Sequence, residues 1–249
     1  MSVLAVDRVS KHFGSLVAVQ DVSLSVEPGE LRAVIGPNGA GKTTFFNLIS
    51  GFFRPTAGTI AFEGQDITAL PAHRRVTAGI ARTFQITEIF PELTVFENVR
   101  ISAEAAAGFR QRPWISPADK AHVRQHVEHT LELTGLHGKA NRLAGELAHG
   151  DQRTTEIAIA LALRPRLLLL DEPTAGMGDQ ETDETMQLIR SLHRKNNFTI
   201  VLIEHDMRVV FDLADRITVL DGGRLLAEGT PEQIAVNEAV QAAYLGNAS

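Results

Sequence analysis

Three short runs of apolar residues, each followed directly by glycine or by charged residues, predict buried strands. They span residues 31–35, 167–170 and 198–203. Strands that are apolar at nearly every position are typical of a parallel sheet covered on both faces, because neither face is left for polar side chains. The pattern therefore predicts an α/β fold with a parallel core.

Two further segments predict antiparallel strands. Residues 58–67 alternate between apolar and polar positions and contain glycines at both ends of the alternation. Residues 216–229 form two apolar runs around Asp221-Gly222-Gly223, which is typical of a β-hairpin turn. We therefore expect a mixed sheet with antiparallel edge strands.

The middle of the chain, residues 86–160, lacks strand-like runs and predicts helices. Ser116-Pro117 followed by Asp119 is typical of a helix start. Val123, Val127 and Leu131 then recur every four residues and form one apolar stripe. We expect a helical subdomain inserted between two parts of the α/β core, residues 1–85 and 161–249.

Composition and charge narrow the class of protein. The chain has 249 residues, no cysteine and a formal net charge of -6. Disulfides and thiolate metal sites are thereby excluded, and the negative charge disfavours a nucleic-acid partner. The start of the chain does not resemble a signal peptide, and the strongly apolar run 167–170 is far below the roughly 20 residues that span a bilayer. A role in membrane transport would need a pore from another chain.

A glycine-rich segment between the first predicted strand and a helix predicts a nucleotide site. It matches G-x-x-x-x-G-K-[ST] at every fixed position, and its backbone N–H groups would surround a phosphate. We expect Lys42 to reach the β- and γ-phosphates of ATP and Thr43 to ligate Mg²⁺. The predicted nucleotide-binding residues here are Gly36, Pro37, Asn38, Gly39, Ala40, Gly41, Lys42, Thr43 and Thr44.

Charged residues at strand ends predict the catalytic groups. Asp171 would hold Mg²⁺ directly or through water, and Glu172 would orient or deprotonate the attacking water. His205, at the end of the next apolar run, would contact the γ-phosphate, although a lone histidine there is often structural. Gln85, between core and helical insert, would be a neutral ligand of Mg²⁺ and water. Phe13 could stack on adenine or simply pack in the core.

Taken in order, these motifs resemble those of the ATP-binding subunits of ABC transporters. "RTFQ", "LTVFENV", "EIAIALALRP", "DEPTAGM" and "AYLG" are similar to the group that takes up branched-chain amino acids. The resemblance implies ATP and Mg²⁺ as cofactors and a P-loop NTPase core. It also implies a second, nonidentical ATP-binding subunit, polytopic membrane subunits and a periplasmic solute-binding protein. The subunit would lie peripherally on the cytoplasmic face of the membrane. Urea and short-amide importers share much of this pattern.

The family resemblance also implies a role for the segment "LAHGDQR" as a signature motif. In ABC dimers a signature motif, usually L-S-G-G-Q, meets the γ-phosphate bound by the opposite subunit. By that match Ala148, His149, Gly150 and Asp151 would contact the partner's ATP in trans. Ala148 lacks the usual serine hydroxyl, and Asp151 adds a negative charge. The alternative is a solvated helix start.

Some signals have competing interpretations. Phe90, Leu93 and Phe96 follow Gln85 and could receive a helix of the membrane subunit or could pack within the helical subdomain. His122, His126 and His129 have helical spacing, but no acid or thiol completes a metal site. A soluble ABC-type ATPase acting outside transport, or a phosphotransferase on the same loop, remain alternative functions; no tandem cassette or acceptor lid favours either.

Replacement of Ala148 by serine tests the weakened signature motif. Ala148→Ser should raise the ATPase rate of the assembled transporter, because one hydrogen bond to a charged group is worth about 1.5–3 kcal/mol. The measurement is the ATPase rate of the assembled complex across ATP concentrations. An unchanged rate at all concentrations would contradict the assignment.

Overall fold

The computed structural model describes residues 2–83, 89–109 and 116–245 and contains two sheets. The larger sheet has the order β10-β9-β3-β8-β7-β6, and only β10 runs antiparallel to its neighbour. Its strands are β3 (Leu31–Ile35), β6 (Ile80–Arg82), β7 (Leu167–Asp171), β8 (Thr199–Ile203), β9 (Arg216–Asp221) and β10 (Arg224–Gly229). The predicted parallel core with an antiparallel edge is therefore confirmed.

The remaining strands form a separate antiparallel sheet, of order β2-β1-β4-β5. These strands are β1 (Leu4–Phe13), β2 (Leu16–Val26), β4 (Ala57–Phe62) and β5 (Gln65–Asp66). The alternating segment predicted as one antiparallel strand therefore forms two short strands, β4 and β5, which pair with each other. β4 also pairs with β1 at the start of the chain, and neither strand joins the parallel core. Alternation reports which face of a strand is buried and not which strand lies next to it.

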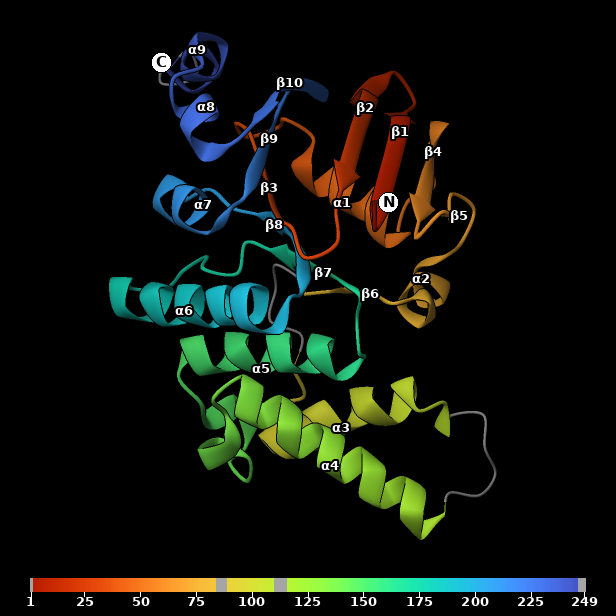
Figure 1. Ribbon diagram of the computed structural model, residues 1–249, viewed down its shortest axis with the longest axis vertical. Coiled ribbons are helices and arrows are strands. Elements are labelled where there is room, and N and C mark those ends of the chain that lie inside the picture. Colours follow the sequence, from red (N-terminus) through yellow and green to blue (C-terminus); the bar gives the residue numbers. More distant parts are fainter. Residues whose placement is uncertain (1, 84–88, 110–115, 246–249) are drawn as a thin grey trace.

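Helices cover both faces of the larger sheet (Figure 1). On one face α1 (Lys42–Ser50) lies between the two sheets, and on the other α5 (His149–Ala162), α6 (Asp179–Asn196) and α7 (Met207–Leu213) pack. In β7, Leu167 and Leu169 join the first hydrophobic cluster, whereas Leu168 and Leu170 join the second. Two covered faces explain why the four positions before Asp171 in this strand are all leucine.

Helices α3 (Val95–Ala106) and α4 (Pro117–Leu133) pack on α5, away from the larger sheet (Figure 1). They share a third hydrophobic cluster that includes Val123, Val127 and Leu131. The predicted start of α4 is confirmed, because the Ser116 hydroxyl and the Asp119 carboxylate form a reciprocal capping box. The boundaries of the helical subdomain at residues 86 and 160 stay a prediction.

Short helices complete the described chain. Two single-turn 3₁₀ helices, His137–Lys139 and Ala144–Glu146, precede α5. Helix α2 (Ala72–Ala78) precedes β6, and α8 (Pro231–Ala235) and α9 (Glu238–Leu245) follow β10. Among the described residues, none of these or the longer helices combines the length and apolar character that crossing a bilayer requires.

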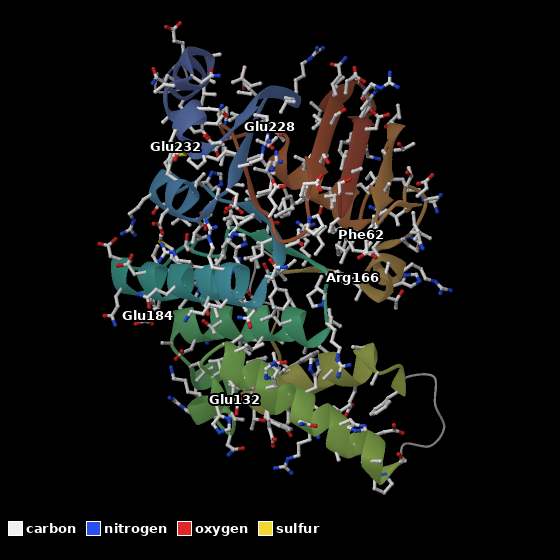
Figure 2. The ribbon with its side chains drawn as sticks, viewed as in Figure 1. Phe62, Glu132, Arg166, Glu184, Glu228 and Glu232 are labelled. Atoms are coloured by element: carbon white, nitrogen blue, oxygen red, sulfur yellow. The ribbon has the colours of Figure 1, made fainter. Side chains whose placement is uncertain are left out.

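Two arginines join elements that are distant in sequence. Arg166, before β7, lies over the ring of Phe62 at the end of β4, 5.4 Å from its centroid, and pairs with Glu63 (Figure 2). Arg75 is 1 % exposed and donates from α2 to the carbonyls of Leu48 and Ile49 at the end of α1. Burial lowers the pKa of Arg75 to about 10, so its guanidinium stays charged near neutral pH. Arg75 therefore closes the carboxyl end of the helix that follows the glycine-rich loop.

Replacing Arg75 by methionine should lower the free energy of unfolding by about 3 kcal/mol, because buried carbonyl oxygens lose a charged donor. Urea unfolding measures the change. Arg74→Met is the matched control, since Arg74 is exposed on the same helix. Equal unfolding midpoints for the two variants would show that α1 does not depend on this cap.

Candidate functional site

The glycine-rich loop connects β3 to α1 and has the conformation that the motif predicts. Gly36 and Gly41 have φ of 152° and 93°. A Cβ atom at Gly36 would lie 2.0 Å from the carbonyl oxygen of Leu220, and one at Gly41 would lie 2.4 Å from that of Ala18. Only glycine fits these two positions, so the close approach of β2 and β9 fixes the loop.

Lys42 is folded back onto this loop. Its Nζ donates to the carbonyl oxygens of Gly36 at 2.7 Å and Pro37 at 3.0 Å. Burial lowers the pKa of Lys42, and the Glu172 carboxylate opposes that shift. The ammonium group is therefore already positioned in the loop, with two neutral acceptors that phosphate oxygens can replace.

The loop opens on a cavity of about 540 Å³. The cavity is also lined by Glu172, His205 and Leu16–Ala18 at the start of β2. Leu16 and Val17 are 64% and 42% exposed and give this polar cavity an apolar wall. The remaining residues that line it are Asn38, Gly39, Ala40, Gly41, Lys42, Thr43 and Thr44.

Glu172 and His205 meet at the carboxyl ends of neighbouring parallel strands. Glu172 Oε1 and His205 Nε2 are 2.5 Å apart, within hydrogen-bond distance. The Glu172 side chain is 12% exposed and that of His205 is 46% exposed. The histidine therefore holds the carboxylate at the cavity wall.

The backbone at Glu172 adopts an uncommon conformation. Its φ is +48°, in the left-handed region that non-glycine residues seldom occupy. Arg153 of α5 donates to the carbonyl oxygens of Asp171 at 2.5 Å and Glu172 at 3.0 Å. Strain of this kind persists where surrounding contacts hold it, and it is found at functional sites. Helix α5 thus holds the turn that carries Glu172.

Asp171 lies behind the cavity wall. It is 2% exposed, and its Oδ2 pairs with Arg82 of β6 at 2.6 Å. Thr43, by contrast, lines the cavity. This donor set fits Mg²⁺ bound directly by the threonine hydroxyl, with the aspartate acting through water.

The predicted trans-acting segment forms the first turn of α5. Ala148 occupies the N-cap position and provides no side-chain cap. Asp151 pairs with Lys139, whose Nζ is 2.5 Å from Oδ1 and 2.6 Å from Oδ2. The negative charge that the sequence introduces next to Gly150 is therefore compensated within the chain.

A single carboxylate caps two helix starts here. Glu181 Oε1 accepts from the backbone N–H of Gly150 at 3.2 Å, and its Oε2 accepts from that of Gly178 at 3.4 Å. Ala148 and Gly178 are the N-cap residues of α5 and α6, and neither has a side chain that can cap. Glu181 supplies the missing acceptor to both.

Several residues predicted for this site do not line the cavity. Gly36 and Pro37 belong to the glycine-rich loop but are absent from the lining, as is Asp171. Gln85 lies outside the described residues. Phe13, at the end of β1, is 42% exposed and makes an edge contact with Phe53 at 5.2 Å between ring centroids. It is absent from the residues that line the cavity, so its contact with adenine stays a prediction.

Sequence reasoning missed Arg82, Arg153, Glu181 and Leu16–Ala18. Arg153 lies within the quoted "LAHGDQR" segment, so its position was visible, but its contact with the strand end was not. Arg82 lies just before Gln85, and no local pattern relates it to Asp171. Leu16–Ala18 closely follow Phe13, but their sequence carries no pattern that relates them to a nucleotide.

A phosphate loop that opens on a cavity, with a carboxylate held at the cavity wall, is typical of a P-loop NTPase, and comparison with known proteins identifies the family. Residues 19–175 match the family model of the ABC transporter, and residues 224–248 match that of the branched-chain amino acid ATP-binding cassette transporter. The chain belongs to the ABC transporter family of ATP-binding subunits, which are ATPases coupled to transport.

Three relatives illustrate the similarity. The high-affinity branched-chain amino acid transport ATP-binding protein BraF of Pseudomonas aeruginosa is 43% identical over 99% of this chain and 98% of its own. The ADP conformation of MJ1267, an ATP-binding cassette of an ABC transporter, is 31% identical with a TM-score of 0.85, covering 99% and 100% of the two chains. A dimeric structure of MJ0796, a bacterial ABC transporter cassette, is 27% identical with a TM-score of 0.77, covering 92% and 98%.

Removal of the Glu181 cap should destabilise the first turns of α5 and α6. Glu181→Ala should lower the free energy of unfolding by about 1–2 kcal/mol, because two backbone donors lose their acceptor. Urea unfolding, with hydrogen exchange of residues 149–152 and 179–182, measures the loss. Glu181→Gln keeps an acceptor oxygen and should lose less than half as much.

Glu184→Ala, one turn further along α6, is the matched control, since Glu184 is exposed. If Glu181→Ala unfolds at the same urea concentration as this control, the shared cap contributes nothing.

Proposed function

We propose that this chain energises an importer of branched-chain amino acids. The match of residues 224–248 to the branched-chain cassette model carries the proposal, because that segment lies outside the match to the general ABC model. The 43% identity to BraF over nearly the full length supports it. In this role the subunit lies on the cytoplasmic face of the membrane and serves membrane subunits and a periplasmic binding protein.

ATP binds with its phosphates on the glycine-rich loop. Lys42 exchanges the carbonyls of Gly36 and Pro37 for phosphate oxygens, and the amino end of α1 faces the same group. The apolar wall at Leu16 and Val17 offers a surface for the base. Mg²⁺, held by Thr43 and through water by Asp171, would neutralise charge that develops on the transferred phosphoryl group.

Glu172 orients the attacking water and accepts its proton. The short contact to His205 Nε2 fixes the direction of the carboxylate, and Arg153 fixes the backbone below it. His205 is half-exposed at the cavity, so it would reach a γ-phosphate by giving up its contact with Glu172. Gln85 stays a proposed ligand of Mg²⁺ and water.

A second ATP-binding subunit completes each site. The start of α5, residues 148–151, would face the γ-phosphate on a nonidentical partner. The related cassette MJ0796 forms a dimer, which supports pairing of two such subunits. Charge compensation of Asp151 by Lys139 removes the main electrostatic objection to this contact. The Gly150 N–H would then serve both Glu181 and the partner's phosphate.

An apolar groove of about 230 Å³ is the proposed dock for the membrane subunit. It lies between the end of α1 and helices α2 and α5, where Phe52, Val76, Ile159 and Leu163 form much of its wall. Arg82 also lines it and pairs with Asp171, so the groove and the nucleotide site share one ion pair. Phe96 instead packs on the helical cluster, and Phe90 is 56% exposed.

Glu172→Gln should slow ATP hydrolysis by at least about 100-fold while ATP binding is retained, because the amide cannot accept a proton. ATPase rates and ATP retention of the assembled complex measure the two effects. The matched control is Glu184→Gln, because Glu184 is an exposed residue of α6. Glu204→Gln is not a suitable control, because Glu204 is buried and accepts a hydrogen bond from Thr174. Wild-type turnover in Glu172→Gln would refute the role.

The substrate is tested in vesicles that contain the full transporter with its membrane subunits and binding protein. ATP-dependent uptake of radiolabelled leucine, isoleucine or valine is expected, and it should be lost with Glu172→Gln. Uptake of urea or a short amide without uptake of these amino acids would replace the proposed solute. ATPase activity indifferent to the membrane subunits would refute a role in transport.

A further inference from the structure

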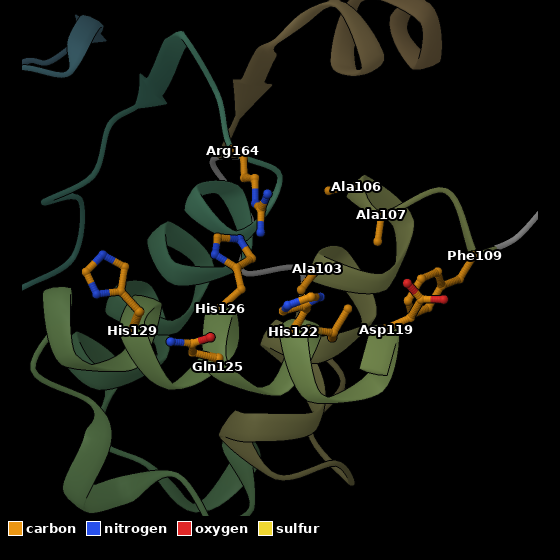
Figure 3. Close-up of a pocket in the computed structure, with 11 residues that line it drawn as sticks. Ala103, Ala106, Ala107, Phe109, Asp119, His122, Gln125, His126, His129 and Arg164 are labelled. Atoms are coloured by element: carbon orange, nitrogen blue, oxygen red, sulfur yellow. The ribbon is translucent and has the colours of Figure 1, made fainter. Parts of the chain in front are cut away.

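The helical subdomain contains a cavity of about 550 Å³ that is separate from the nucleotide site (Figure 3). Helix α4 forms one side, and the end of α3 and Arg164, two residues after α5, form the others. Its size is typical of a small-molecule pocket. The lining residues are Ala103, Ala106, Ala107, Phe109, Asp119, His122, Val123, Gln125, His126, His129 and Arg164.

Four of the side chains that line this cavity are basic. His122, His126 and His129 come from α4, and Arg164 comes from the turn after α5. Among the described residues, no group of three or more His, Cys, Asp or Glu side chains is arranged to hold a metal ion, so the histidine spacing does not indicate a metal site. Asp119 is the sole acid among the lining residues, and it already accepts bonds from the Ser116 cap.

Arg164 has the properties of a group available to a ligand. Figure 3 shows its side chain reaching toward His126. Within residues 2–83, 89–109 and 116–245, its guanidinium has no ion pair or hydrogen bond. Its φ is +56°, a conformation in which asparagine or glycine is more common than arginine. A strained backbone therefore presents an unpaired cation to the cavity.

The other part of the lining is apolar. Three alanines at the end of α3, with Phe109 and Val123, provide small and aromatic surfaces beside the basic groups. A bare inorganic anion would leave this surface uncovered. A molecule with one negatively charged group and a short hydrocarbon body matches both parts.

We propose that this cavity binds a small organic carboxylate with a short apolar body. The carboxylate pairs with Arg164, the imidazoles of His126 and His129 lie beside it, and the hydrocarbon part packs on Ala103, Ala107 and Phe109. This site is independent of the identity of the transported solute.

The cavity contacts the end of α5 opposite the signature-like turn. His126 Nε2 donates to the carbonyl oxygen of Ala162, the last residue of α5, at 3.0 Å. A helix of 14 residues extends about 21 Å, so a ligand here and the partner's ATP would act on the two ends of one rigid element. A bound carboxylate thereby has a route to the ATPase rate.

Binding should depend on pH. Burial lowers the pKa of His126, and the charges of Arg164 and His129 lower it further. The hydrogen bond to the Ala162 carbonyl acts in the opposite direction and raises this pKa. A bound carboxylate favours the imidazolium form, so affinity should increase as pH falls from about 8 to about 6. Asp119 and His122, on the same helix, also face the cavity, whereas the lining residues of α3 do not titrate.

Isothermal titration calorimetry of the full chain tests the proposal, with ADP and Mg²⁺ at saturation to occupy the phosphate loop. The probe is 4-methyl-2-oxopentanoate, compared with acetate and inorganic phosphate. We expect saturable binding with a Kd of about 1 mM or lower, and acetate at least about tenfold weaker. Tighter binding of phosphate than of the probe would overturn the assigned ligand class.

Variants separate a ligand site from a purely structural role, since a cation at a helix carboxyl end also stabilises the helix. Arg164→Asn tolerates the positive φ and should weaken binding at least about tenfold with a near-native melting temperature. Arg124→Asn, on the exposed flank of α4, should bind as wild type. No saturable binding of the probe, or an unchanged Kd in Arg164→Asn, would overturn the proposal.

Discussion

The contact between Arg153 and the end of β7 is the constraint on which the catalytic geometry depends. One guanidinium from α5 bonds two successive carbonyl oxygens and is itself paired with Glu156 at 2.5 Å in the interior. That arrangement maintains left-handed backbone at Glu172, which places its carboxylate beside His205 and the glycine-rich loop. Residues 148–151 form the start of the same helix. Helix α5 therefore supports both the segment that would face a partner and Glu172, the proposed catalytic base of this chain's own site.

Charge compensation explains how the unusual signature sequence is tolerated. Lys139 pairs with Asp151, and Glu181 supplies the acceptor that Ala148 and Gly178 lack. Both helix starts are thus satisfied, and the acid next to Gly150 is paired on the side of the helical subdomain. The residues Ala148 and Gly178 thus transfer the capping role to Glu181, and the backbone of each helix start keeps its hydrogen bond.

Local patterns predicted the features whose partners are near in sequence. The glycine-rich loop, the β-turn at Gly222-Gly223 and the Ser116 capping box each depend on a few consecutive residues. The meeting of Glu172 and His205 was also predictable, because the ends of parallel strands converge. The pairing of Arg82 with Asp171, 89 residues apart, depends on the order of strands, which periodicity does not contain. For the same reason the separation of the antiparallel strands into their own sheet was not predicted.

The resting position of Lys42 has a consequence for selectivity. Its ammonium group already donates to two carbonyl oxygens. The free energy gained when an anion binds is therefore only the difference between its hydrogen bonds to Lys42 and those that Lys42 gives up. A monovalent anion offers little beyond what the lysine has. A triphosphate engages the lysine, the loop amides and the helix end simultaneously, and such combined contacts exceed the loss. The two carbonyl acceptors of Lys42 thus favour a triphosphate over chloride and similar monovalent ions at this loop.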